Sequence, residues 1–177
     1  MASLIETPAT QGLGLPLTRG AASLSAVETG PVTAVAPFRG RRDGVERLLG
    51  PLPAPGPVAP WGGGRLLWAG EGRWLLIGVA APEGLEAHAA LAEQGDGIAA
   101  VMLEGAAARD VLARLVPLDL RDRAFPVGAS ARSLLNHMTV TLTRPAEAAW
   151  EVMAMRSMAG TLVHEIEAAM RAVAARG

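Results

Sequence analysis

Histidines are the first side chains to consider, because imidazole is the commonest metal ligand and a general base near neutral pH. The chain has three, at His88, His137 and His164. No two of them are four residues apart, the spacing with which a helix presents two histidines to one zinc ion. We therefore expect ordinary solvated or hydrogen-bonded histidines, one on a polar helix face, one in a strand and one on the last helix.

Three aspartates lie close enough in sequence to form a paired-carboxylate site: Asp110, Asp119 and Asp122. Four arginines are interleaved with them: Arg109, Arg114, Arg121 and Arg123. Charges of opposite sign that alternate in this way usually form local ion pairs on a solvated surface. We expect ion pairing here rather than acid–base chemistry.

Composition removes several further kinds of site. All 16 basic residues are arginine, so no lysine is present for a Schiff base or a phosphate loop. The chain has no cysteine, which excludes disulfides, thiolate nucleophiles and thiolate metal sites. The glycines of 12–14 and 62–64 lack the six-residue dinucleotide pattern, so we expect them in turns.

Length and charge bound the class of protein. The chain has 177 residues, of which 50% are hydrophobic, enough for one globular domain or at most two small ones. Its net charge is −1 and no like-charged run could follow phosphates, so nucleic acid is not an expected partner. No apolar run approaches the roughly 20 residues that cross a bilayer. The N-terminus lacks the basic start of a signal peptide, and we expect a soluble cytoplasmic protein.

Periodicity and turn residues predict the elements of the first half of the chain. Strands are expected over 22–27 and 32–38 around a turn, and a hairpin with arms over 65–69 and 73–79. Helices are expected over 43–49, with Asp43 as its cap and Gly50 as its end, and over 82–95. Five prolines within 51–60 favour a stiff extended connector between them.

The second half repeats this order. The sequence predicts a strand over 98–103, a helix over 106–116, a hairpin with arms over 131–143 and 150–155, and a helix over 158–173. Trp74 and Trp150 each begin the second arm of a hairpin. We therefore predict an α+β fold of two similar halves, each with the order strand, helix, hairpin, helix.

Two regions suggest contact with a partner. Residues 1–20 are expected to form an irregular arm ahead of a single α+β domain over 21–177. The arm carries Leu13, Leu15 and Leu17 but no periodic element to bury them, and Trp61 lies between the proline-rich connector and flexible glycines. We expect these four residues to belong to a partner interface. The alternative for the arm is disorder.

Three segments resemble the gamma subunit of heterotetrameric sarcosine oxidase. They are WGGGRLLWAGEGRWLLIG over 61–78, LEGAAARDVLARLVPLDLRDRAFPVG over 103–128, and MRSMA over 155–159. The middle segment is the most specific, and the residues that carry it are Gly105, Ala108, Arg109, Leu112, the run 117–120, Phe125 and Gly128. The resemblance covers most of the chain from about residue 20 onward.

That family is similar to the first domain of the glycine-cleavage aminomethyltransferase, a folate-binding α+β fold with two related halves. The resemblance implies a noncatalytic subunit that assembles with alpha, beta and delta subunits. Those partners would hold FAD, FMN, NAD and tetrahydrofolate, while this chain alone is expected to bind none of them. The complex would oxidatively demethylate sarcosine to glycine, form hydrogen peroxide and pass the one-carbon unit to tetrahydrofolate.

Two other functions stay open at this point. The chain could be a free-standing module that binds folate or one-carbon units. It could also be an independent enzyme whose site the sequence does not reveal.

Overall fold

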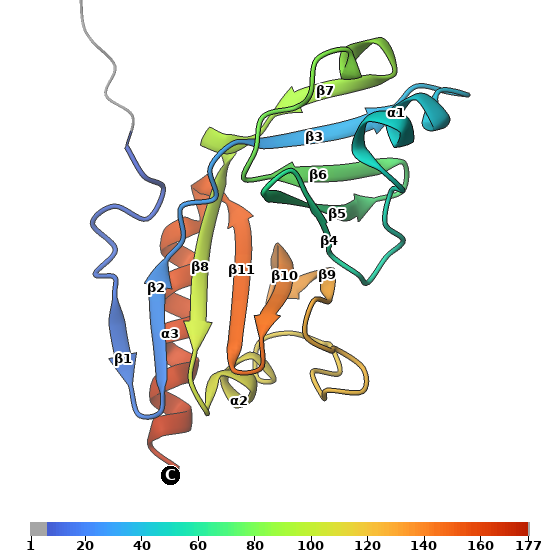
Figure 1. Ribbon diagram of the computed structural model, residues 1–177. Helices are drawn as coiled ribbons and strands as arrows, with labels where there is room; N and C mark the ends of the chain where they lie inside the picture. The colour runs from blue at the N-terminus through green and yellow to red at the C-terminus, as the bar shows by residue number, and fades with distance from the viewer. Residues whose placement is uncertain (1–6, 177) are drawn as a thin grey trace, which may run out of the picture.

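The computed structural model describes residues 7–176, in which the strands form two antiparallel sheets (Figure 1). The six-stranded sheet has, in spatial order, β1 (Leu17–Arg19), β2 (Ala22–Ala26), β8 (Ile98–Glu104), β11 (Ala149–Met155), β10 (Met138–Ala146) and β9 (Ser130–Leu135). The five-stranded sheet has β4 (Ala59–Trp61), β5 (Gly64–Gly70), β6 (Arg73–Ile77), β3 (Val32–Pro37) and β7 (Ala89–Glu93).

Helices cover the outer faces of the two sheets. The α-helices are α1 (Arg42–Leu49), α2 (Ala108–Leu112) and α3 (Ala159–Ala174), and the 3₁₀ turns are η1 (Leu85–Ala87), η2 (Gly95–Gly97) and η3 (Arg156–Met158). In Figure 1, α3 runs along the six-stranded sheet, and α1 lies on the five-stranded sheet. No helix within residues 7–176 combines the length and apolar character needed to cross a membrane.

The inner faces of the sheets pack against each other, so β11 is buried on both sides. Trp150, Val152 and Ala154 point into the large core beneath α2 and α3. Met153 points the other way, into a smaller core that the two sheets share with Val32 and Leu67. Since successive side chains of a strand alternate between faces, a strand buried on both faces must be apolar along nearly all of its length.

The two halves repeat one topology, as the sequence predicts. The order β4-β5-β6-β3 in one sheet matches β9-β10-β11-β8 in the other. In each half the hairpin shifts register just before its turn, between Trp68 and Gly70 and between Thr143 and Ala146. Trp74 pairs with Val35 and Trp150 pairs with Leu103, so the tryptophans occupy equivalent positions. The α+β fold of two similar halves is confirmed.

Both tryptophans are core residues fixed by the loop that follows the helix of their own half. Trp74 is buried, and its indole Nε1 donates a hydrogen bond of 2.8 Å to the carbonyl of Pro53, after α1. Trp150 is also buried, and its ring lies 5.3 Å from that of Phe125, after α2. These contacts join helix, loop and sheet within each half.

The expected helix over 82–95 is wrong. The segment forms η1 and then strand β7, which pairs with β3. Gly84 has φ +82°, a left-handed conformation that interrupts a helix, and Leu85 is fully buried in the core under α1. The alanines of 89–92 favour a helix by propensity, but pairing with the free edge of β3 satisfies their backbone and overrides it.

Other expected elements need smaller corrections. Asp43 does not cap α1, whose N-cap is Arg41 without a side-chain bond, although Gly50 does end the helix with φ +76°. The arm over 131–143 is two strands, β9 and β10, because Asn136 turns the chain with φ +51°. The helix over 106–116 is only the short α2, and β2 and β3 belong to different sheets.

The N-terminal arm is less irregular than expected. Residues 17–19 form β1 at the edge of the six-stranded sheet, and Leu13, Leu15 and Leu17 are half-buried against the large core. Arg19 joins β1 to α3 through an ion pair of 2.7 Å with Glu167. The core that buries these leucines comes from α3 and β2, distant in sequence or outside any helical period. Residues 1–6 of the arm lie outside the described residues.

A carboxylate is buried between the two sheets. Glu151, on β11, is 3% exposed, and both of its oxygens lie 2.6 Å from Nη2 of Arg65, on β5 of the other sheet. The hydroxyl of Thr143 donates a further bond of 2.9 Å to Glu151. Because a buried charge without partners is strongly unfavourable, these bonds fix how the two halves face each other.

We expect truncation of the buried face of α3 to destabilise the fold. Leu162→Ala and Ile166→Ala should each lower the free energy of unfolding by about 2 to 5 kcal/mol, since both side chains are fully buried in the large core. Denaturant unfolding followed by circular dichroism measures the loss. The exposed His164→Ala is the control and should change stability by less than about 0.5 kcal/mol. Losses below about 1 kcal/mol at both buried positions would contradict this packing.

The charge pair between the sheets should show strong coupling. Arg65→Met leaves the Glu151 carboxylate buried with Thr143 as its remaining partner, and should cost about 2 to 3 kcal/mol of unfolding free energy. Adding Glu151→Leu removes the unpaired charge, so the double variant should be more stable than Arg65→Met alone. A double-mutant cycle by urea unfolding measures the coupling, and additive losses would show that the pair does not join the sheets.

Candidate functional site

The histidines lie in three separate places. His88 follows η1, not a helix face, and its buried Nδ1 atom has no hydrogen-bond partner among the described residues. His137 is exposed in the turn between β9 and β10, and His164 is exposed on α3. Among residues 7–176, no group of three or more histidine, aspartate or glutamate side chains is arranged to hold a metal ion.

The aspartates after α2 form ion pairs, as the sequence predicts. Asp119 accepts bonds from Arg121 at its backbone N–H, Nε and Nη2, and the last two measure 2.7 and 2.5 Å. These bonds lower the pKa of Asp119 to about 2. Asp122 pairs with Arg144 at 2.7 Å and also with Arg109, and the bond from Arg144 leads the lowering of its pKa. The paired-carboxylate alternative therefore does not hold for these two residues.

Arg144 is the centre of this cluster and is only 1% exposed. Its guanidinium donates to the carbonyls of Phe125 and Glu147, at 2.7 and 2.8 Å, and lies 4.9 Å from the ring centroid of Trp150. It thus ties the loop after α2 to the β10–β11 turn. A buried arginine with this many bonds is a structural residue that holds loops in place.

The four expected interface residues are not one surface. Leu13 lies over Gly160 at the start of α3, and Leu13, Leu15 and Leu17 contact the large core. Trp61 ends β4 and packs, half-buried, against the separate core under α1. The glycines that follow it are turn residues, as expected, with φ +54° at Gly62 and +87° at Gly63. Each leucine, and Trp61, still has surface that a partner could cover.

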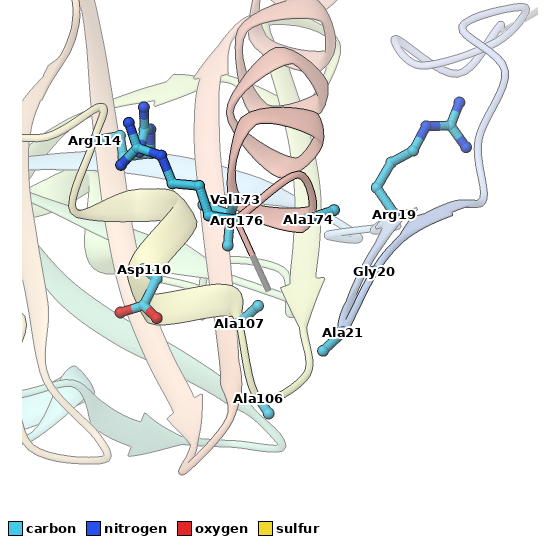
Figure 2. Close-up of a pocket in the computed structure, with 10 residues that line it drawn as sticks. All are labelled: Arg19, Gly20, Ala21, Ala106, Ala107, Asp110, Arg114, Val173, Ala174 and Arg176. Atoms are coloured by element: carbon cyan, nitrogen blue, oxygen red, sulfur yellow. The ribbon is translucent and has the colours of Figure 1, made fainter.

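A groove of about 680 Å³ opens where the β1–β2 turn meets α2 and the end of α3 (Figure 2). Its floor consists of small residues: Gly20, Ala21, Ala106, Ala107 and Ala174. Close packing makes some of these sizes necessary. A Cβ atom on Gly20 would lie 2.8 Å from that of Ala174, and one on Gly105, beside the floor, would lie 2.3 Å from the carbonyl oxygen of Ala21.

The charged lining of the groove is mostly cationic. In Figure 2, Arg114 and Arg176 reach to the same side above Asp110, while Arg19 points away from them. Desolvation raises the pKa of Glu167, but hydrogen bonds from Arg171 and Arg19 outweigh it, and the pKa ends below its ordinary value. Arginine stays protonated at all relevant pH values, so this lining supplies electrostatic attraction rather than proton transfer.

Two structural residues were missed at the level of sequence, Glu151 and Arg144. The signal for Glu151 was present, since one carboxylate interrupts an otherwise apolar strand over 149–155. For Arg144 the sequence carried no comparable signal, because an arginine beside Pro145 in a turn is ordinarily solvated.

Sequence comparisons relate the chain to one family. The family model described as sarcosine oxidase, gamma subunit family, matches residues 61–170. Sarcosine oxidase subunit gamma of Corynebacterium sp. (strain P-1) is 34% identical over 119 residues, which are 61% of this chain and 57% of that relative. The match therefore spans little more than half of the relative's length.

Structural comparisons agree on the fold. A chain of the heterotetrameric sarcosine oxidase from Corynebacterium sp. U-96, solved with pyrrole 2-carboxylate, matches with a TM-score of 0.78 and 23% identity, over 94% of this chain and 91% of that one. Aminomethyltransferase T of the glycine cleavage system from Bartonella henselae matches with a TM-score of 0.59 and 16% identity, over 84% of this chain and 46% of that one. Both likenesses concern the fold.

The pairing of Asp119 predicts a measurable pH dependence. Its pKa in the folded protein, about 2, is below that of the unfolded chain, so the pairing stabilises the fold above the unfolded pKa. That stabilisation is lost as the pH falls through the folded pKa. NMR titration of the Asp119 carboxyl should give a midpoint near 2, and Arg121→Gln should move it up to the ordinary range. A midpoint that Arg121→Gln leaves unchanged would show that the two side chains do not pair in solution.

Proposed function

Since the chain belongs to the sarcosine oxidase gamma subunit family, we propose that it is a noncatalytic subunit of a cytoplasmic hetero-oligomeric complex that oxidises sarcosine. The family match carries the proposal, because it runs from the end of β4 through most of α3 and so includes the hairpins of both halves. The fold likeness to a chain of heterotetrameric sarcosine oxidase is consistent with it.

The proposed reaction belongs to the whole complex. Sarcosine loses its N-methyl group by oxidation and becomes glycine, the electrons reduce oxygen to hydrogen peroxide, and tetrahydrofolate accepts the one-carbon unit. We assign FAD, FMN, NAD and tetrahydrofolate to the alpha, beta and delta partner subunits. This chain's part is to pack against them.

The use of charged side chains supports a structural role. Glu151 is bonded to Arg65 and Thr143 between the sheets, and Asp122 is bonded to Arg144 beside Trp150. Groups that could act as acids or bases are in this way held by the fold itself. A general base needs a pKa near the working pH, and the lowered pKa values of Asp119 and Asp122 move away from it.

The test is reconstitution. The chain should be purified alone and together with the alpha, beta and delta subunits, and peroxide formation from sarcosine measured in each sample. We expect activity and flavin absorbance in the complex and neither in the isolated chain. Peroxide formed by the chain alone would refute the noncatalytic role. Tight binding of tetrahydrofolate by the chain, without association with those subunits, would favour the folate-binding module instead.

Trp61 is the residue whose loss should weaken assembly. Trp61→Ala is expected to reduce the affinity for partner subunits by about 2 kcal/mol or more, as truncation of an aromatic anchor does. Isothermal titration or surface-based binding measures the change. Trp68→Ala is the matched control, because Trp68 is also half-buried on the core under α1.

The two tryptophan variants should lose similar stability, and the difference between them lies in assembly. Equal affinities of the two variants for the partners would place the interface away from Trp61. Deletion of 2–18 is not a suitable test, since it would also remove the core contacts of Leu13, Leu15 and Leu17.

A further inference from the structure

We propose that β7 is the docking edge for an extended, antiparallel segment of a partner subunit, which completes the five-stranded sheet as its sixth strand. This inference rests on the proposed function, since it names the surface that joins this chain to its complex. In Figure 1, β7 forms the outer edge of its sheet, with β3 on its inner side.

The internal repeat defines the missing position. The six-stranded sheet continues past β8 with β2 and then β1, whereas the five-stranded sheet continues past β3 with β7 and ends. β2 is antiparallel to β8, and β7 is antiparallel to β3, so β7 is the equivalent of β2. The place that β1 fills beside β2 holds no strand beside β7 within residues 7–176.

Side-chain rows across the sheets give the same result. In the six-stranded sheet, Leu17, Leu24, Leu103 and Trp150 stand opposite one another on successive strands. The equivalent row of the other sheet is Leu91, Val35 and Trp74.

The end of each row differs in burial. Leu24, which Leu17 flanks, is fully buried, but its equivalent Leu91 is only half-buried. An apolar side chain in the position of Leu17 would cover Leu91 in the same way.

The backbone of β7 has hydrogen-bonding groups directed outward. Phe38 donates to the carbonyl of His88, and Gln94 donates to that of Val32, so even-numbered residues from 88 to 94 face β3. In an antiparallel pair the bonding direction alternates, and the N–H and C=O groups of Ala89, Leu91 and Glu93 therefore point away from the sheet. These groups offer three residues of ladder to an added strand.

β7 also lacks the features that protect an edge strand from pairing. Folded proteins shorten their edges or place proline or basic residues in them. β1 and β4 have three residues each, with Arg19 in the first and Pro60 in the second, and β9 carries Arg132. The five residues of β7 are AALAE, and its acid, Glu93, accepts a bond of 3.0 Å from the hydroxyl of Thr33 in its own sheet.

These features define the chemistry of the occupant. It is a short extended segment with an apolar residue opposite Leu91, as Leu17 stands opposite Leu24. Beside Glu93, which keeps an exposed side chain, it carries a neutral or basic residue. Alanines at 90 and 92, on the other face, leave room for its remaining side chains.

Residue-resolved hydrogen exchange tests the proposal with an internal control. Amide exchange should be measured for the isolated chain and for the complex assembled with the alpha, beta and delta subunits. We expect the amides of Ala89, Leu91 and Glu93 to exchange at least roughly tenfold more slowly in the complex. The amides of Ala90 and Ala92, which already bond to β3, should be protected in both samples.

Two variants give a second readout in the full chain. Glu93→Pro removes an outward N–H without removing a bond to β3, and should weaken assembly by roughly tenfold or more. Ala90→Lys, on the opposite face of the same edge, is the matched control and should assemble as the unchanged chain does. Circular dichroism establishes that both variants are folded.

The outcomes separate this inference from the proposed function. A complex that forms while Ala89, Leu91 and Glu93 exchange as in the isolated chain would overturn the docking edge and leave the proposed function standing. Failure to associate with the partner subunits at all would overturn both. Protection of these amides in the isolated chain at rising concentration would make a second copy of this chain the occupant, which also overturns the inference.

Discussion

The buried carboxylate of Glu151 is the constraint on which the arrangement of the two halves depends. It lies in β11, the strand covered on both faces, and Arg65 reaches it from the other sheet. A second arginine crosses the same interface, where Arg132 donates to the carbonyl of Ala69 at 2.8 Å. An apolar interface would tolerate sliding between the sheets, whereas directed bonds to a buried charge allow one register. The inner faces are thereby closed, and the edges and outer loops are left for partners.

Each half repeats a second device around its tryptophan. An arginine lies over each indole, Arg42 at 5.2 Å from the centroid of Trp74 and Arg144 at 4.9 Å from that of Trp150. The arginines come from different elements, α1 in one half and β10 in the other. The duplicated fold has therefore kept the need for a cation over the ring while changing the residue that supplies it. The halves then diverge at their ends, where one adds α3 and the other adds β7.

Much of this fold follows from local signals in the sequence. Strong alternation placed β5, β6 and β11, the apolar stripe through Leu162 and Ile166 placed α3, and the paired tryptophans indicated the repeat. The failures share one cause, which is that distant contacts decided the outcome. β7 is a strand because β3 offers an edge, and Leu13 is half-buried because α3 lies beneath it. Glu151 could be noticed as an acid in an apolar strand, but its partner lies 86 residues away and no local pattern identifies Arg65.

A duplicated, internally bonded fold with an open edge describes a protein that works by association. The most direct test is native mass spectrometry of the chain captured with its partners from its own cell extract. The account predicts that the chain is recovered in a stoichiometric hetero-oligomer whose larger subunits carry the flavins. Recovery of the chain as a monomer or as a homo-oligomer, with the flavin-containing subunits absent, would contradict it.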